Sequence, residues 1–538
     1  MRKLATLWAV LVIALVSAIA NAQQSYILFD LTAGSHYTQT AAYGINKQGD
    51  ITGFEVLKTG AIHAFIFKNG AFQDLGLLGY QASVGIAINN ADQLAADGEG
   101  PGTTALFYAN GTATPIGNVD GGFSYVFGIN NNGDIVGTAL NGDNAYVGFS
   151  WIGGVFTDLS PLGVYRARSI NDSDQLVGSS LYSWSYGGYV HTSAHGCLVS
   201  GGSFTDLGSL TGNPETNTEA YGINNAGQIV GYSTGSDNLL HAFLYSSGSM
   251  QDLGTIGSDY AIAVAINNAG QIVGILQNPY GASLGSFLYA NGAMTDLSTL
   301  IARGGMGWSG LTVTAINDNG AIVGYGAVNN GSQGFLAVPA GTPLSTGLTV
   351  SSVKGQIGSA TTLSALLMAT TLGLPAAGAT VQFSVDGTKV GAPVTTNALG
   401  QAKLKYAVPE GMAIGTHTIT ATFAGDAYYA ASSGSGTLSL AKGPVKITVH
   451  SVTGQAGTTV TLSALLTDND KAPLPNESLS FSVAGISVGS ANTNASGVAS
   501  LPYTIPSGTA SGTYSILVSF AGDASHLAGS RTGTLTVK

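Results

Sequence analysis

The sequence predicts an all-β chain, a seven-bladed β-propeller followed by two immunoglobulin-like (Ig-like) β-sandwiches, and three observations lead to this fold class. A decamer typified by INNAGQIVGY (223–232) occurs seven times between residues 45 and 325. A different unit, in which TLSALL recurs at an offset of 99 residues, occurs twice after residue 347. Gly supplies 78 of 538 residues while charged residues supply only 8%, which is typical of β-structure with many tight turns.

The N-terminal segment 1–22 predicts export through a cleaved signal peptide. Basic residues at positions 2 and 3 precede an apolar stretch (4–19), and Ala-Asn-Ala (20–22) forms an A-x-A cleavage site. An uncleaved membrane anchor is the alternative, because the apolar stretch is close to the length that spans a bilayer. The polar residues that follow favour cleavage, so the expected location is secreted or at the cell surface.

Charge and cysteine content exclude several classes of partner and cofactor. Without its two N-terminal basic residues the chain has 15 basic and 28 acidic residues and a net charge of −13, so nucleic acids and anionic membranes are not expected partners. The single Cys197 excludes an intrachain disulfide, and because most repeats have Phe at this position we expect a buried apolar thiol. No cofactor or metal is expected, since INDNG (316–320) lacks the later acid of a calcium loop.

The seven decamers define a repeat of four short strands. They begin at Ile45, Ile88, Ile129, Ile170, Ile223, Ile266 and Ile316. An aromatic-apolar strand such as HAFLY (241–245) follows, and then a strand that contains Asp-Leu, as in QDLGTIG (251–257). Uninterrupted copies are 41 to 43 residues apart, which matches a propeller blade. An open β-solenoid is the alternative.

The two ends of the repeat region argue against the solenoid. After the seventh copy the chain reaches Pro339 without an Asp-Leu strand, and YILFDL (26–31) stands unused near the N-terminus. The first strand is therefore expected to complete the seventh blade, which closes the ring and removes open sheet edges. The predicted domains are the propeller at 23–340, a linker at 341–347, and Ig-like domains at 348–442 and 443–538.

Recurrent polar residues are interpreted first as structural. The Asn at the second position of each decamer is expected to cap its own backbone and close the turn, often with a Gly three residues later. A ring of ligand-binding amides is the functional alternative. The Asp that precedes Leu is expected to brace the blade, and His63 and His241 belong to the repeated strand.

Two resemblances follow from these motifs. GINNAGQIVG followed by HAFLY and DLG resembles the HAF family of extracellular repeats over residues 26–338, which implies an exported bacterial protein without an established enzymatic activity. The C-terminal units, with FAGDAYY (423–429) matched by FAGDASH (520–526), resemble bacterial Ig-like repeats. That resemblance implies a spacer between a surface and a working head.

The candidate binding residues lie in irregular insertions. Amphipathic aromatic rings with few charges suit a sugar or a peptide, although such a loop could instead fold back and bury its own rings. The loop LYSWSYGGYVHTSAH (181–195) is the main candidate, and a loop at 301–310 is expected to form the other side of a cleft. The candidate residues are Tyr182, Trp184, Tyr186, Tyr189, His191, Arg303 and Trp308.

The predicted function is that of a secreted or cell-surface bacterial binding or adhesion protein, expected to be monomeric. The propeller would recognise a carbohydrate or protein ligand, with the Ig-like domains as spacer. A structural matrix component without a discrete ligand is one alternative. A polysaccharide-acting enzyme that uses Glu215 and Glu219 is the other, but no catalytic motif is present and no catalytic residue is assigned.

Overall fold

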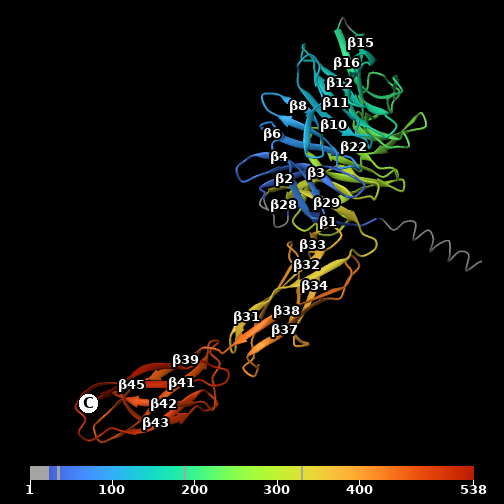
Figure 1. Ribbon diagram of the computed structural model, residues 1–538. Coiled ribbons are helices and arrows are strands. Elements are labelled where there is room, and N and C mark those ends of the chain that lie inside the picture. The colour runs from blue at the N-terminus through green and yellow to red at the C-terminus, as the bar shows by residue number, and fades with distance from the viewer. Residues whose placement is uncertain (1–23, 33–36, 187–188, 329–330) are drawn as a thin grey trace, which may run out of the picture. The chain divides into compact units, whose positions relative to one another are not determined.

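The computed structural model describes residues 24–32, 37–186, 189–328 and 331–538, and it divides them into two compact units. One unit extends to Pro343 and includes Thr371–Leu374, and the other comprises Leu344–Thr370 and Pro375–Lys538. Strands dominate both units (Figure 1). Within the described residues no helix is long and apolar enough to cross a lipid bilayer. The predicted signal peptide (1–22) lies outside the described residues.

The N-terminal unit begins with four sheets of four strands each, and in every sheet consecutive strands are neighbours. Their strands are β2 (Gln39–Ile45), β3 (Ile51–Val56), β4 (Ile62–Lys68), β5 (Ala71–Asp74), β6 (Ala82–Ile88), β7 (Leu94–Glu99), β8 (Thr103–Ala109), β9 (Thr112–Pro115), β10 (Ser124–Ile129), β11 (Ile135–Leu140), β12 (Tyr146–Ile152), β13 (Val155–Asp158), β14 (Val164–Ile170), β15 (Leu176–Tyr186), β16 (Tyr189–Ser200) and β17 (Ser203–Asp206). A 3-10 helix (Ser160–Leu162) follows β13.

Two larger sheets complete this unit. An eight-stranded sheet and a five-stranded sheet, in which the N-terminal β1 lies between β26 and β29, follow the first four. Their strands are β18 (Thr218–Ile223), β19 (Ile229–Thr234), β20 (Leu240–Ser246), β21 (Ser249–Gly254), β22 (Tyr260–Ile266), β23 (Ile272–Gln277), β24 (Ser283–Ala290), β25 (Ala293–Asp296), β1 (Tyr26–Asp30), β26 (Ile301–Arg303), β27 (Ser309–Ile316), β28 (Ile322–Val328) and β29 (Gly331–Pro339). The short helix α2 (Leu297–Leu300) precedes β26.

The predicted fold class is confirmed as all-β, but the prediction of seven equivalent propeller blades is wrong. The fifth and sixth repeats share one sheet through a parallel bridge between Leu240 and Tyr260. β26 adds a fifth strand beside β1. Equal spacing of motifs predicts equal units, yet the contacts between strands of neighbouring repeats are set by local loop geometry. We therefore describe residues 24–340 by their separate sheets and call them the repeat unit.

The predicted role of the first strand is present in the structure. β1 pairs antiparallel with β29, from Tyr26 opposite Pro339 to Asp30 opposite Phe335. Tyr26, Ile27 and Leu28 are at most 3% exposed. The N-terminal strand therefore belongs to the core of the last sheet.

The Ile-Val pair of the decamer packs against neighbouring repeats, as INNAGQIVGY (223–232) illustrates. Ile229 packs with Phe243 and Ala220, whereas Val230 packs with Ala261 and other residues of the next repeat. The Gly that follows this pair is required, because a Cβ at Gly231 would lie 1.9 Å from the carbonyl oxygen of Glu219. The predicted burial of Cys197 is confirmed, and burial raises the pKa of its thiol to about 12.

The C-terminal unit contains two β-sandwiches, each built from two sheets. The repeated Phe of VQFSV (381–385) and LSFSV (479–483) is buried in both, as Phe383 and Phe481. The strands are β30 (Thr346–Val350), β31 (Val353–Gln356), β32 (Ala360–Ala369), β33 (Leu374–Pro375), β34 (Thr380–Val385), β35 (Thr388–Thr395), β36 (Gln401–Ala407), β37 (Gly415–Phe423), β38 (Ser432–Ala441), β39 (Val445–His450), β40 (Val452–Gly454), β41 (Thr459–Asp468), β42 (Ser478–Val483), β43 (Ile486–Asn492), β44 (Val498–Thr504), β45 (Gly512–Phe520) and β46 (Gly529–Val537).

Candidate functional site

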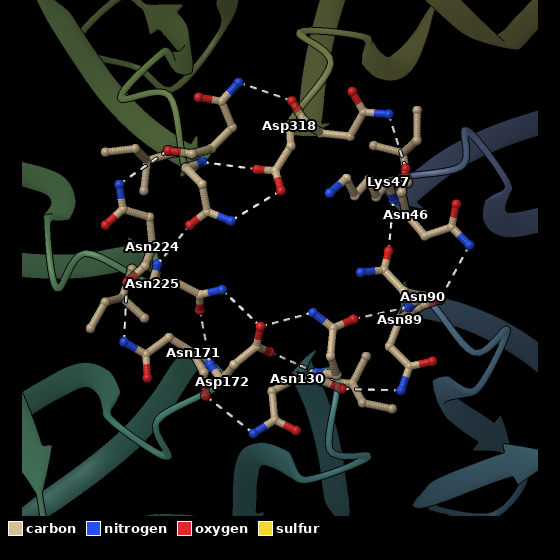
Figure 2. A pocket seen from close by; sticks show the side chains of 18 of the residues that line it. Asn46, Lys47, Asn89, Asn90, Asn130, Asn171, Asp172, Asn224, Asn225 and Asp318 are labelled. Carbon is tan, nitrogen blue, oxygen red and sulfur yellow. Dashed lines mark hydrogen bonds between the residues drawn. The ribbon is translucent and has the colours of Figure 1, made fainter.

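The first Asn of each decamer forms a closed ring of hydrogen bonds. Each Nδ2 donates to the backbone oxygen of the corresponding Asn in the next repeat, and the seventh donates back to the first (Figure 2). The bonds are Asn46 to Asn89 (3.2 Å), Asn89 to Asn130 (3.1 Å), Asn130 to Asn171 (3.1 Å), Asn171 to Asn224 (3.1 Å), Asn224 to Asn267 (3.1 Å), Asn267 to Asn317 (2.9 Å) and Asn317 to Asn46 (2.9 Å).

The same side chains also close their own turns, as predicted. In the fifth copy, Asn224 Oδ1 accepts the N–H groups of Ala226 at 3.1 Å and Gln228 at 3.0 Å. Its Nδ2 also donates to Oε1 of Gln228 at 2.8 Å. Because donors and acceptors of the amide are both used within the protein, the ring is scaffold and the alternative of ligand-binding amides is not favoured.

A second ring runs through the next residue of each turn and stops at Lys47. The backbone N–H of Lys47 donates to Oδ1 of Asn90, and the pattern continues until Asn268 donates to Oδ1 of Asp318. The intervening bonds run in the same way, from the backbone N–H of one residue to the side-chain Oδ1 of the next, and they are Asn90 to Asn131, Asn131 to Asp172, Asp172 to Asn225 and Asn225 to Asn268. Since Lys47 has no side-chain acceptor, it interrupts this second ring between the last and first repeats. A small polar pocket of about 210 Å³ lies at these turns.

The repeated His and Asp residues brace adjacent strands. Nδ1 of His63 lies 2.8 Å from a carboxylate oxygen of Asp74, and Nδ1 of His241 lies 2.9 Å from one of Asp252. A carboxylate oxygen of this Asp also accepts the backbone N–H of the residue two positions later. In the first repeat, the N–H of Gly76 donates to Oδ1 of Asp74 at 2.7 Å. The predicted structural role of these residues is confirmed.

The described parts of the loop 181–195, residues 181–186 and 189–195, pair as an extension of β15 and β16, and we call them the aromatic hairpin. Trp184 lies opposite His191, and their rings stack at 5.5 Å between centroids. Tyr182 stacks on Trp184 at 5.9 Å and on His195 at 4.9 Å. The structure therefore brings three of the predicted residues into one ladder of rings.

The remaining predicted residues are distributed differently. Tyr189 is 75% exposed and lies opposite Tyr186, whose side chain is outside the described part. Arg303 ends β26, and Trp308 lies in the loop between β26 and β27, two strands of a different sheet from the aromatic hairpin. Trp308 contacts Phe335 edge-on at 6.0 Å and packs against the core of that sheet. The structure thus gives Trp308 a packing role.

Sequence reasoning missed a set of seven bulge residues. In every repeat the pairing between the first two strands skips the residue two positions before the Ile of the decamer, which is the signature of a β-bulge that redirects a side chain. The fourth and seventh repeats have a second irregularity earlier in the first strand. The skipped residues are Tyr43, Ile86, Phe127, Arg168, Tyr221, Val264 and Thr314. This position lies two residues before the Ile of each decamer. Its residue type varies strongly among the repeats while those of its neighbours do not, and this contrast in the sequence could have identified the set.

A charged cluster surrounds one of these bulge residues. The Arg168 guanidinium lies 4.6 Å from the centroid of the Phe127 ring and 4.8 Å from that of Tyr221. Glu219, which is 6% exposed, lies 3.7 Å from Arg168 and accepts the Tyr165 hydroxyl at 3.1 Å. Glu219 is thus buried beside Arg168, whereas Glu215 is exposed.

The comparison with family models identifies the C-terminal domains. Residues 348–441 and 447–538 match the bacterial Ig-like domain (group 3), which confirms the two predicted Ig-like domains. No curated protein matches the chain. The family description gives the type of these two domains and no activity.

Similar solved structures are tandem Ig-like proteins and adhesin repeats. Titin Ig tandem domains A164–A165 are 13% identical at a TM-score of 0.18, with 36% of this chain and 96% of that chain covered. The Yersinia pseudotuberculosis adhesin InvE is 14% identical at 0.18, with 36% and 58% covered. A tetra-tandem repeat from the extending region of a large adhesion protein is 15% identical at 0.21, with 82% and 95% covered. At these TM-scores the likeness carries no argument about arrangement.

The comparisons also correct two predictions for the repeat unit. The family model that matches lies within residues 348–538 and does not extend into the repeat unit, so the HAF assignment has no support there. The sheets of four, five and eight strands described above overturn the assignment of seven equal propeller blades. The all-β class and the hydrogen-bonded turns are independent of those names.

Proposed function

We propose that the protein is an exported binding protein whose aromatic hairpin (181–195) holds a carbohydrate or protein ligand, with the Ig-like domains as spacer. The observation that carries this proposal is the ladder of stacked rings formed by Tyr182, Trp184 and His191. Stacked amphipathic rings bind sugar faces and peptide side chains through apolar contact while their polar atoms remain available for hydrogen bonds.

The hairpin holds these rings in a defined arrangement. Tyr182 and Trp184 are two residues apart on one strand, so both lie on the same face, and His191 extends that face across the pair. His195 anchors the ladder, since its ring nitrogens lie 2.7 Å from Asp206 and 2.6 Å from the carbonyl oxygen of Pro214. A recognition surface gains affinity when its side chains are ordered before the ligand arrives.

Exposure of the hairpin supports binding over self-packing. Tyr182 is 38% exposed, Leu181 57%, and Val190 74%. A loop that folded back to bury its own rings would leave these side chains covered. A concentration of large exposed apolar side chains on one extension is typical of an interaction site.

Glycan and peptide arrays probed with the full mature chain test the proposal. Trp184→Ala and Tyr182→Ala are expected to reduce the bound signal by about tenfold or more, since truncating an aromatic anchor commonly costs at least 2 kcal/mol. Tyr280→Ala is the matched control, because Tyr280 is 94% exposed in another sheet's loop. If the double variant binds as the parent does, or if no ligand is retained on either array, the hairpin site is wrong and a matrix component without a discrete ligand is favoured.

A further inference from the structure

A cavity of about 490 Å³ lies in the repeat unit among residues that the proposed function does not use. Four of the seven bulge residues line it, including Tyr43 and Phe127. Phe54, Asp97 and Glu99 also line the cavity. Its volume is within the range of small-molecule sites, and such sites combine apolar walls with a few polar groups.

One of the aromatic rings that line the cavity, that of Phe127, already contacts a cation of the protein itself. The Arg168 guanidinium lies 4.6 Å from the Phe127 centroid, a distance at which the ring quadrupole attracts positive charge. Tyr43 packs 5.8 Å from Phe54 and 6.3 Å from Tyr325 between ring centroids, so these rings hold one another in place. Arg168 is itself paired with Glu219 and does not supply charge to the carboxyl groups of the cavity.

Asp97 is a buried carboxyl group without a countercharge. It is 7% exposed, and its Oδ1 accepts the backbone N–H of Val126 at 3.0 Å. Among the residues that the structure describes, no basic side chain forms an ion pair with Asp97. Burial, followed by the neighbouring Glu99, raises the pKa of Asp97 to about 8. Burying a carboxylate is unfavourable unless a cation accompanies it, so this position lacks what would stabilise its charged form.

We infer that this cavity binds the ammonium group of a small organic cation. Asp97 and Glu99 supply the countercharge, and the rings of Tyr43, Phe54 and Phe127 enclose the carbon atoms attached to nitrogen. The two carboxyl groups disfavour an anion. A hard metal ion is also disfavoured, because it requires several oxygen ligands where this cavity presents aromatic walls. The inference is independent of the aromatic hairpin.

Calorimetric titration of the full mature protein with choline tests the inference, with 3,3-dimethylbutan-1-ol as an uncharged ligand of the same shape. Choline is expected to bind at least tenfold more tightly, because the difference between the ligands is the charge. Binding at pH 7 is also expected to release protons, since the cation favours ionised Asp97. Titration in two buffers of different ionisation enthalpy measures this release. Glu99 and Tyr43 are the other titratable groups that line the cavity.

Variants separate a cation site from an apolar pocket. Asp97→Asn keeps the size of the side chain and is expected to weaken choline binding at least tenfold and to abolish proton release, whereas Asp143→Asn, at an exposed position, leaves both unchanged. If Asp97→Asn does not fold, Glu99→Gln on the same strand and proton release in the parent decide the question. Equal binding of the two ligands, absence of choline binding, or full binding by the Asp97 variant would each overturn the inference. Array binding by the aromatic hairpin is expected to be unaffected by Asp97→Asn, so the two proposals fail independently.

Discussion

The side-chain amide of Asn317 donates a hydrogen bond of 2.9 Å to the backbone oxygen of Asn46, 271 residues earlier in the chain. Both residues are buried. This bond joins the last and first turns of the repeat unit at the place where Lys47 interrupts the second ring. The first ring continues across this junction, and Asn319 Nδ2 adds a bond of 2.8 Å to the backbone oxygen of Lys47.

Replacing Asn317 is expected to destabilise the repeat unit. Asn317→Ala removes the bond to Asn46 and leaves the backbone N–H groups of Asn319 and Ala321 without their acceptor. The expected loss is about 2 to 4 kcal/mol of unfolding free energy, measured by chemical denaturation. Asn319→Ala is the control, because that exposed side chain donates only to Lys47 and should change stability by less than about 0.5 kcal/mol. Equal effects from the two variants would show that the first ring is energetically unimportant.

The N-terminal strand is expected to be essential for the stability of the repeat unit. Phe29→Ala in β1 truncates a side chain that is 4% exposed and leaves a cavity in its place. Such truncations of buried Phe lower the free energy of unfolding by about 3 to 5 kcal/mol. Phe123→Ala, at a position that is 43% exposed, should cost much less. Thermal unfolding of both variants checks this. A Phe29 variant as stable as the parent would mean that β1 does not pair with β29 in solution.

Glu55 is expected to make the repeat unit less stable as pH rises. It is buried, and burial, together with the charge of Asp74, raises its pKa to about 7. Because the folded pKa exceeds the ordinary value of 4.5, the folded state binds more protons and loses stability between about pH 4.5 and pH 7. Glu55→Gln should remove a loss of roughly 1 to 3 kcal/mol over this range. Unfolding free energies at pH 5 and pH 8 test the effect, and an identical pH slope in parent and variant would contradict it.

The first Ig-like domain is expected to depend on pH through His417 and Asp386. Nδ1 of His417 lies 2.6 Å from Oδ2 of Asp386, and this hydrogen bond raises the pKa of His417 and lowers that of Asp386. The contribution of His417 is present below its ordinary pKa of 6.5 and is lost as pH rises through the raised value. The contribution of Asp386 is present above 3.8 and is lost as pH falls through the lowered value.

His417→Gln should therefore flatten the decline in stability above pH 6.5. The measurement is the thermal midpoint of the full chain as a function of pH. His450→Gln, in the second Ig-like domain, is the control, since His450 contacts the Ser463 hydroxyl and no carboxylate in the described contacts. If the His417 variant keeps the slope of the parent, another group titrates in that window.

The sequence predicted local features better than contacts between repeats. Turns capped by Asn224 and its equivalents, the strand 26–31 and the buried Cys197 follow from residues near one another or from the repeat pattern itself. The prediction of seven equal blades failed where neighbouring repeats join. The bridge between Leu240 and Tyr260 depends on the path of a loop, and no sequence motif marks it.

The same distinction holds for the candidate sites. The aromatic hairpin is contiguous, so its rings were visible in the sequence. The cavity collects side chains from separate repeats, and Asp97 was hidden as the last residue of an irregular decamer (88–97). Departure from the repeat pattern was therefore the signal that the sequence offered for this site.

The pairing of β1 with β29 also governs when the repeat unit can finish folding. Tyr26 leaves the ribosome early, but its partner Pro339 is synthesised more than three hundred residues later. Contacts so distant in sequence form slowly. The last sheet therefore forms only after the C-terminal end of the repeat unit has been synthesised, and until then the earliest strand stays without its partner β29.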